Sequence, residues 1–247
     1  MSESEALRVE QRSGHLRVTL NRPAVRNAID LATVQALHLV CEQLEASPQP
    51  LVLTGAGSCF AGGADIAQLR ERGPVEALAG INSRTFDRVA RLPMPTVALV
   101  NGPAVGGGAE LAYACDLRVA TPSASFSNPE VGLGIVAAAG ACWRLRELVG
   151  LSVAQSVLLG GRSLDAASAL ACGLVLDVVE EAEAEAYVES LVRRIGRGDP
   201  LALRLTKIVL GTPGAGHPFI DDVAQAVAFG SEQKERRMTA FLERSVS

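Results

Sequence analysis

The amino-acid sequence predicts an α/β fold organised as a single domain over residues 1–247. Short apolar runs that suit buried strands alternate with helical segments through the first half of the chain, a pattern typical of a layered α/β core. The length of 247 residues is one that single α/β domains commonly reach. Hydrophobic residues make up 48% and charged residues 20%, which indicates a folded globular chain rather than a disordered one.

The first predicted unit is a β-hairpin, a helix and a strand. In order, these are residues 7–11 and 16–21 around Ser13-Gly14, helix Leu31–Ala46 and strand Leu51–Gly55. The hairpin follows from alternating apolar and polar residues, and Asp30 is a suitable N-cap for the helix. His38 lies on the apolar helix face, where we interpret it as a hydrogen-bonded core residue rather than a ligand.

The same alternation then recurs before the chain becomes mainly helical. The expected elements are helix 75–91, strand 96–101, a helix from residue 106 to 115, and strand Leu117–Ala120. A strand-like segment at 124–126 follows. Beyond residue 138 the expected helices are 151–159, Ala166–Ala171, 181–195, Pro200–Leu210 and 231–244, with one strand at 174–179.

Charge and composition exclude several classes of partner. The 23 basic and 27 acidic residues give a net charge of −4, and no Lys/Arg block suggests a nucleic-acid or anionic-membrane surface. The longest uncharged run, residues 92–109, is broken by Pro and Gly, so we expect no membrane segment and a cytoplasmic protein. The cysteines lack CxxC spacing and are interpreted mainly as buried thiols; with only three His residues, no metal site is expected. They are Cys41, Cys59, Cys115, Cys142 and Cys172.

Two glycine-rich turns, residues 54–65 and 101–110, each follow a predicted strand. Small residues let a ligand approach the backbone, and a helix that begins within Gly106-Gly107-Gly108 has free N–H groups able to hold an oxyanion. Tight packing alone is the alternative explanation for either turn. Neither turn matches the dinucleotide or P-loop patterns.

Two acids accompany these turns. Glu110 lies in the first turn of the helix among apolar residues, where it complements the helix dipole or serves proton transfer with a tuned pKa. Glu130 follows the turn Asn128-Pro129 and, taken alone, is interpreted as a solvated loop residue.

The sequence resembles the enoyl-CoA hydratase/isomerase family, also called the crotonase family, over nearly its whole length. The matching segments, in order, are Asn21-Arg22-Pro23 with Arg26-Asn27-Ala28, residues 60–65, residues 101–112 and residues 126–134. Pro200-Leu201-Ala202 and the terminal helix around Phe241 are also similar to family members.

This resemblance implies a fold, a reaction and a set of site residues. The fold is a crotonase-like spiral of ββα units over about residues 1–195, followed by a C-terminal helical trimerisation region over about 196–247. The implied activity is that of an enoyl-CoA hydratase of fatty-acid metabolism, which adds water to a trans-2-enoyl-CoA without any cofactor beyond the CoA of the substrate. The partners implied are the acyl-CoA and further copies of the chain, as a homotrimer or a dimer of trimers. Glu110 and Glu130 are the implied catalytic acids, the N–H groups of Ala64 and Gly107 the oxyanion hole, and the substrate- or CoA-binding residues are Ala24, Arg26, Gly62, Ala64, Asp65, Ile66 and Gly107.

The chain departs from the family pattern at two places. After Glu130 the usual Gly-x-x-Pro-Gly-x-Gly-Gly segment has Ala137, Ala138 and Ala141 in place of Pro and two Gly, which can narrow the water site. Trp143 follows and is interpreted as a core anchor, with a place in an acyl pocket as the alternative.

The second departure is Ala67, which replaces a Lys that approaches a CoA phosphate in many members, so Arg26 is our candidate for that contact. A solvated surface arginine is the alternative for Arg26. Three functions stay open: the hydratase, another crotonase reaction such as enoyl-CoA isomerisation or acyl-CoA hydrolysis, and a non-catalytic acyl-CoA-binding protein.

Overall fold

The computed structural model describes residues 6–244, apart from the side chains of Phe241 and Arg244. The ends of the predicted 1–247 domain, and the side chain of Phe241 used in the family resemblance, therefore lie outside the described part. A six-stranded sheet in the order β1-β2-β3-β4-β6-β9 forms the centre. Its strands are Leu7–Arg12, His15–Leu20, Leu51–Gly55, Thr96–Val100, Leu117–Ala120 and Asp177–Val178. Only β1 and β2 pair antiparallel; the later neighbours are parallel.

A second, three-stranded sheet in the order β5-β7-β8 lies beyond the first. Its strands are Pro103–Val105, Ser125–Ser127 and Leu164–Asp165. Strands β5 and β7 follow β4 and β6 of the large sheet, and β8 comes directly before a helix. The chain therefore winds as successive ββα units. The predicted α/β spiral is therefore the observed architecture.

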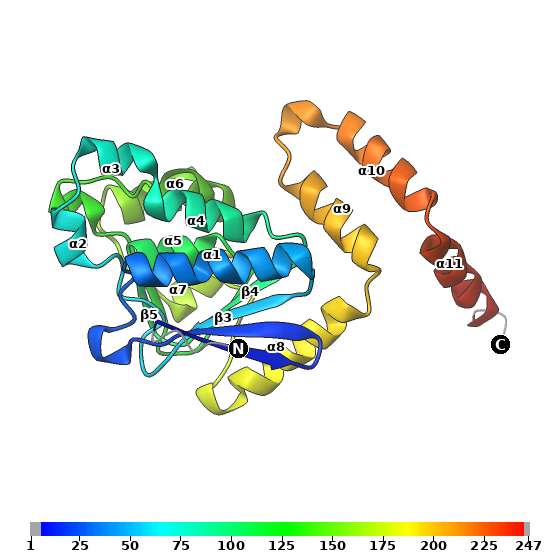
Figure 1. Ribbon diagram of the computed structural model, residues 1–247, viewed down its shortest axis with the longest axis horizontal. Coiled ribbons are helices and arrows are strands. Elements are labelled where there is room, and N and C mark those ends of the chain that lie inside the picture. The colour runs from blue at the N-terminus through cyan, green and yellow to red at the C-terminus, as the bar shows by residue number, and fades with distance from the viewer. Residues whose placement is uncertain (1–5, 245–247) are drawn as a thin grey trace.

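Helices cover both faces of the large sheet (Figure 1). On one face α1 (Leu31–Ala46), α4 (Ile81–Ala90) and α5 (Gly107–Tyr113) enclose the main core. On the other face α8 (Glu181–Gly196) packs on a smaller apolar cluster. Successive strand residues point to opposite faces, so Leu51 and Leu53 belong to the main core and Val52 to the α8 cluster.

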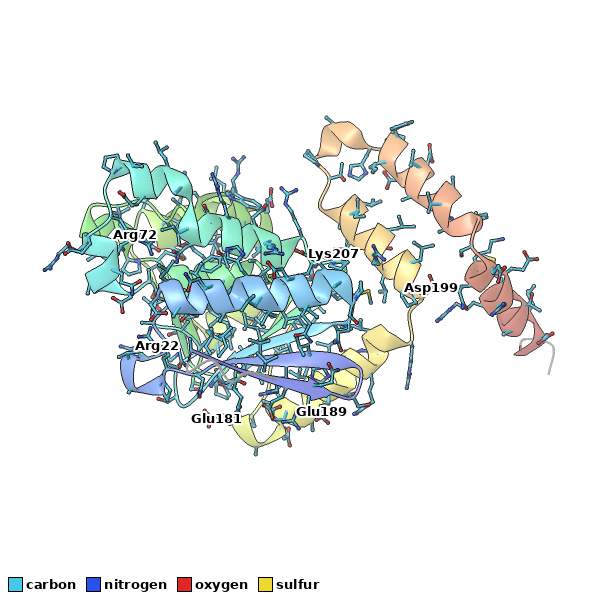
Figure 2. The ribbon with its side chains drawn as sticks, viewed as in Figure 1. Arg22, Arg72, Glu181, Glu189, Asp199 and Lys207 are labelled. Carbon is cyan, nitrogen blue, oxygen red and sulfur yellow. The ribbon has the colours of Figure 1, made fainter. Side chains whose placement is uncertain are left out.

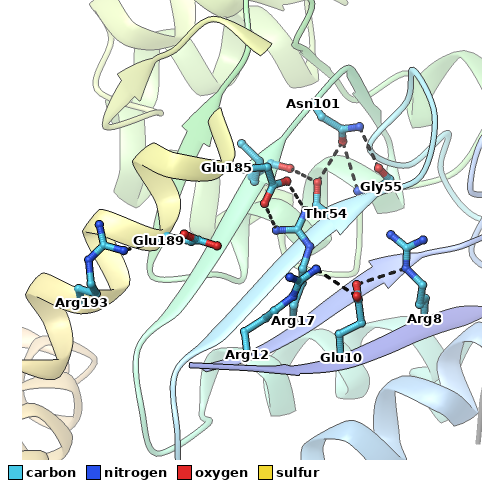
Figure 3. Close-up of polar contacts among 11 residues, drawn as sticks. Arg8, Glu10, Arg12, Arg17, Thr54, Gly55, Asn101, Glu185, Glu189 and Arg193 are labelled. Carbon is cyan, nitrogen blue, oxygen red and sulfur yellow. Dashed lines mark hydrogen bonds and ion pairs between the residues drawn. The ribbon is translucent and has the colours of Figure 1, made fainter. Parts of the chain in front are cut away.

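An ion pair also connects α8 to the sheet. The guanidinium of Arg17 on β2 donates to the carboxylate of Glu185 on α8, as Figure 3 shows. Arg17 is buried beneath the helix, whereas the Glu185 side chain is half exposed. The pair therefore fixes the position of α8 while its acid remains in contact with solvent.

Local sequence signals predict most elements but miss several breaks. Asp30 caps α1 by accepting a hydrogen bond from the Thr33 N–H at 2.8 Å, as expected. The helix predicted over 75–91 is instead two helices, α3 (Pro74–Ala79) and α4, because Gly80 adopts a left-handed backbone with φ of 65°. Of the strand predicted over 174–179, the structure contains only the two residues of β9, Asp177–Val178. Helices α2 (Ile66–Arg70) and α10 (Phe219–Phe229), together with β5 and β8, were not predicted.

The region after the sheet agrees more closely with the prediction. Helix α6 (Arg146–Leu158) contains a non-helical residue at Gly150, so the predicted 151–159 helix corresponds to its second part. Helix α7 (Ala166–Ala171) has the predicted bounds. Helices α9 (Pro200–Leu210), α10 and α11 (Glu232–Arg244) extend away from the sheet region (Figure 1).

The C-terminal helices bury little of their apolar surface within the chain. Lys207 of α9 reaches the body of the molecule, where its Nζ lies 2.6 Å from Asp116 Oδ2 and 3.2 Å from the Met94 carbonyl (Figure 2). Large apolar side chains are exposed along these helices, namely Ile208, Leu210, Phe219, Val223, Val227, Phe229, Met238 and Leu242. A surface of this kind favours a protein partner.

The positions of the thiols agree only in part with their prediction, whereas His38 makes the expected hydrogen bond. Cys41, Cys59 and Cys115 are buried as expected, but Cys142 is exposed and Cys172 half buried. His38 is half buried and hydrogen-bonded through Nε2 to Thr85 Oγ1 at 3.1 Å. Between residues 6 and 244, no group of three or more His, Cys, Asp or Glu is arranged to bind a metal, and no helix is long and apolar enough to cross a bilayer.

Candidate functional site

A cavity of about 420 Å³ lies where the two glycine-rich turns meet helix α4 and the segment after Glu130. It brings together six predicted site residues from segments far apart in the sequence: Gly62, Ala64, Ile66, Gly107, Glu110 and Glu130. Its apolar wall is made by Leu69, Ala77, Ile81, Leu133, Ile135 and Val136. The cavity therefore combines a polar end with a surface suited to an aliphatic group.

The two turns lie side by side because they leave neighbouring parallel strands, β3 and β4. The Asn101 side chain joins them: its amide donates to the Gly55 carbonyl at 2.8 Å and accepts from the Gly55 N–H at 3.2 Å (Figure 3). Gly108 permits the close contact farther along, since a Cβ there would lie 2.2 Å from the Ala61 carbonyl oxygen. Asn101 and Gly108 together thus allow the backbones of the two turns to lie in direct contact.

Two backbone donors face the polar end of the cavity. A Cβ built on Gly107 would lie 3.4 Å from the Ala64 nitrogen, so the two amides are adjacent. Gly107 is the first residue of α5, and the N–H groups of a first helical turn have no intrahelical acceptor. Within residues 6–244, neither the Ala64 nor the Gly107 N–H donates a hydrogen bond. Two adjacent free donors form a suitable site for a negatively charged oxygen.

Glu110 extends from α5 into the same cavity and is buried, with 3% of its surface exposed. The Ala141 N–H donates to its Oε1 at 3.1 Å. Burial raises the pKa of Glu110 to about 7, the nearby Glu130 adds to the rise, and the N–H of Ala141 and the guanidinium of Arg144 oppose it. A carboxyl group with this pKa is able both to accept and to donate a proton near neutrality.

Glu130 begins a short 3-10 turn, Glu130–Leu133, and lines the cavity beside the second glycine-rich turn, since a Cβ on Gly106 would lie 3.1 Å from its Oε1. It is also buried, and burial raises its pKa. Asn128 Nδ2 lies 3.5 Å from its Oε1, and the Tyr113 hydroxyl donates to Asn128 Oδ1 at 3.1 Å. Glu130 Oε2 has no partner within the described chain, so it is available to a ligand or water.

The remaining predicted binding residues lie outside the cavity wall. Asp65 caps α2, accepting from the N–H groups of Ala67 and Gln68 at 3.1 Å each, which gives its carboxylate a structural role. Ala24 and Arg26 are exposed, although the Arg26 carbonyl accepts from the Gly62 N–H at 2.7 Å and so supports the first turn. Whether Arg26 contacts a phosphate stays a prediction.

The interpretation of Trp143 as a core anchor is wrong. Its side chain is 48% exposed and its ring lies over the Arg144 guanidinium, 3.9 Å from the centroid. It belongs to a smaller hollow of about 240 Å³ that shares Ser83, Ala138 and Ala139 with the main cavity. A large apolar residue beside an arginine gains a cation–π contact that a sequence pattern alone does not reveal.

The structure adds two polar residues that the sequence did not indicate. Arg72 and Asn82 line the cavity, and Arg72 Nη1 donates to Asn82 Oδ1 at 3.1 Å. Figure 2 shows Arg72 on the side of the molecule formed by α2 and α3. Its neighbours Arg70 and Glu71 are exposed charges, so nothing in the local sequence distinguishes Arg72 from a solvated surface residue.

This arrangement has the parts for chemistry beside a carbonyl group. The Ala64 and Gly107 N–H groups can stabilise charge on a carbonyl oxygen, and two buried carboxyl groups in the same cavity can transfer protons near that carbonyl. These groups suit a substrate whose carbonyl oxygen becomes negatively charged during reaction.

Comparisons with known proteins agree with this geometry. A family model described as enoyl-CoA hydratase/isomerase matches residues 10–245. A short-chain-enoyl-CoA hydratase of Clostridium acetobutylicum is 35% identical over 239 residues, covering 92% of this chain and 90% of the relative. A crotonyl-CoA hydratase of Syntrophomonas wolfei is 34% identical over 234 residues, 91% of this chain and 90% of the relative. The crystal structure of an enoyl-CoA hydratase from Bacillus anthracis superposes with a TM-score of 0.91 at 28% identity, covering 97% and 96% of the two chains.

Proposed function

The chain belongs to the enoyl-CoA hydratase/isomerase family, and we propose that it is an enoyl-CoA hydratase. It adds water across the double bond of a trans-2-enoyl-CoA to give a 3-hydroxyacyl-CoA. The observation that carries this proposal is the presence of two buried carboxyl groups, Glu110 and Glu130, in one cavity with two free backbone donors. Hydration uses one group to activate water and one to deliver a proton, whereas shifting a double bond needs a single base.

The proposed reaction follows from the positions of these groups. The thioester oxygen accepts hydrogen bonds from the Ala64 and Gly107 N–H groups, each worth about 3 kcal/mol to a developing oxyanion. Glu110 takes a proton from water as the water oxygen bonds to C3, and the electrons of the double bond move toward the thioester oxygen. Glu130 delivers a proton to C2 as the enolate collapses, so the elements of water are added and no other atom is lost.

The raised pKa values of both acids suit this exchange. One carboxyl group must be ionised and the other protonated when substrate binds, and the reverse holds once the product has formed. Because burial raises the pKa of Glu110 and of Glu130, the pair can share one proton near neutral pH and titrate as a unit. A proton passing between them through water restores the starting state.

The departure at residues 137–141 is compatible with this role. Ala137, Ala139 and Ala141 are buried, and the Ala141 N–H still donates to Glu110. Of the three substituted residues, Ala138 lines the cavity, whereas Ala137 and Ala141 are buried and do not line it. The substitutions therefore leave in place the backbone donor that orients Glu110. This contact supports the hydratase proposal over that of a non-catalytic acyl-CoA-binding protein.

The proposed substrate partner is an acyl-CoA thioester, and the reaction requires no further cofactor. Addition of water changes no net oxidation state, and the donors and acids above meet its electrostatic and proton demands. The cytoplasm is the proposed location, which the free thiols in the described structure support.

We also propose that the chain assembles as a homotrimer or a dimer of trimers. The exposed apolar side chains of α9, α10 and α11 support this proposal, because association would remove them from water. Analytical ultracentrifugation at micromolar concentration tests it. A trimer or hexamer is expected, and a stable monomer contradicts the proposal.

The function is tested by incubating the protein with crotonyl-CoA and longer 2-enoyl-CoAs while the enoyl-thioester absorbance is followed. We expect the absorbance to fall and a 3-hydroxyacyl-CoA to form. Assays with a 3-enoyl-CoA and a saturated acyl-CoA detect isomerase and thioesterase activity. Binding of all these thioesters without hydration overturns the proposal.

A further inference from the structure

A buried arginine that the proposed chemistry does not use lies near Glu110, close enough to oppose the rise of its pKa. Arg144 lies in a π-helical turn, Ala141–Leu145, and only 6% of its surface is exposed. Such turns in helices are frequent at functional sites. A charge buried to this extent is costly unless it is paired and hydrogen-bonded, so its partners indicate what it holds in place.

Those partners belong to two walls of the cavity. Arg144 Nη2 donates to Asp87 Oδ1 on α4 at 3.1 Å, and Nη1 donates to the Ala139 carbonyl at 3.4 Å. Residues 81–83 near the start of α4 line the cavity, as do Ala138 and Ala139. One guanidinium therefore ties α4 to the turn after Glu130.

The same guanidinium lies against the backbone of Gly140, next to the residue whose N–H donates to Glu110. A Cβ on Gly140 would lie 2.3 Å from Arg144 Nη1, and Gly140 has φ of 135°, a conformation in which a side chain is strained. The next residue, Ala141, supplies the N–H that donates to Glu110 Oε1. The position of this donor thus depends on where Arg144 is held.

We propose that Arg144, fixed by Asp87, is a positioning residue that holds the 139–141 turn so that the Ala141 N–H stays on Glu110. Trp143 covers the guanidinium on its other side through a cation–π contact. This inference rests on the proposed hydratase function for its kinetic consequence, but its structural claim is independent of that function. Loss of the Arg144–Asp87 pair releases the 139–141 turn, and the ionised form of Glu110 then loses the hydrogen bond from the Ala141 N–H.

The pKa of Glu110 distinguishes a change in the position of the Ala141 N–H from a change in the surrounding charge. Glu110 interacts with Glu130, Arg144, Tyr113 and Cys142. Arg144 interacts in turn with Asp87, Glu147, Arg91 and Glu110. Removing the negative charge of Asp87 would by itself lower the pKa of Glu110, whereas losing the Ala141 hydrogen bond raises it. The two effects have opposite signs.

The test compares two substitutions with Arg91→Met. Asp87→Asn keeps the shape of the side chain but leaves the buried guanidinium without its paired negative charge, and Arg144→Lys keeps the positive charge but removes the planar fork. Arg91 pairs with the other oxygen of Asp87 at 2.6 Å, and its side chain is 79% exposed. The Arg91→Met substitution therefore removes a charge beside Asp87 without changing a residue of the 139–141 turn. Hydrogen exchange of peptides spanning 134–146, measured by mass spectrometry, reports the turn directly. We expect faster exchange in Asp87→Asn and Arg144→Lys, and wild-type exchange in Arg91→Met.

Kinetics with crotonyl-CoA supply the second readout. We expect Asp87→Asn to lower kcat by about tenfold or more, since small misplacements of catalytic groups are costly, while KM changes little. The acidic limb of its pH profile should move to higher pH, and that of Arg91→Met should stay in place. If Arg144→Lys fails to fold, as judged by circular dichroism, Asp87→Asn carries the test.

Two results overturn the proposal: wild-type exchange of the turn in Asp87→Asn, or an acidic limb that moves to lower pH. Failure of the proposed function is a distinct outcome, in which the wild-type chain itself hydrates no 2-enoyl-CoA. The exchange measurement then still decides whether Arg144 holds the turn.

Discussion

Replacing Glu110 by Gln is expected to stabilise the folded chain at alkaline pH. In the folded state burial raises the pKa of Glu110 to about 7 from an ordinary value of 4.5. Because the folded state binds this proton more tightly than the unfolded state, its stability falls as pH rises from about 4.5 through 7. At about 1.4 kcal/mol per pH unit, the loss amounts to about 3 kcal/mol above pH 8. Glutamine carries no charge and keeps an oxygen to accept from the Ala141 N–H, so it avoids most of this loss.

The assay is denaturant unfolding of wild type and Glu110→Gln at pH 5 and pH 8, at one protein concentration. We expect the variant to gain stability at pH 8, by up to about 3 kcal/mol, and to gain far less at pH 5. Glu71→Gln is the matched control, since the Glu71 side chain is 72% exposed, and it should show no such pH dependence. A Glu110→Gln variant that is equally or less stable than wild type at pH 8 would refute the argument that burial of this carboxylate is costly.

Three further predictions concern activity and binding. The kcat/KM for hydration should fall below about pH 7 as Glu110 becomes protonated, and a pH profile that stays flat down to pH 5 contradicts its role as base. Tyr113→Phe removes the hydroxyl that holds Asn128 and should lower kcat several-fold with little change in KM; an unchanged kcat means that this hydrogen bond does not orient Glu130. Arg26→Ala should weaken acyl-CoA binding in calorimetry, more strongly at low ionic strength, and equal affinity across salt removes Arg26 from the site.

Elements with strong local signals were predictable from the sequence. Helix α1 has the predicted bounds because Asp30 caps it and its apolar residues recur at helical spacing. Glu110 was identified from its place after Gly106-Gly107-Gly108. The short strands β5 and β8 were missed because two or three residues carry too little periodicity to register.

What the sequence did not predict depends on contacts between distant segments. The pairing of Arg144 with Asp87 joins residues 57 positions apart, and neither residue has a local pattern that distinguishes it from surface charge. Large aromatic residues are usually buried, which is why the sequence predicts Trp143 in the core. A cation–π contact with the adjacent Arg144 guanidinium instead stabilises the ring in a half-exposed position. Arg72 lines the cavity because α2 and α3 lie beside it, and its local sequence does not indicate that placement.

The proposed mechanism depends most directly on the joint action of Glu110 and Glu130. The decisive measurement is the rate of crotonyl-CoA hydration by Glu110→Gln, Glu130→Gln and the double variant, with binding of butyryl-CoA as the control for site integrity. Each single change should lower kcat by about 100-fold or more while binding is retained, because the oxyanion donors are backbone groups. The double variant should lose much less than the product of the two single losses, since both residues act on one water molecule. Hydration at the wild-type rate by both single variants would contradict the proposed mechanism.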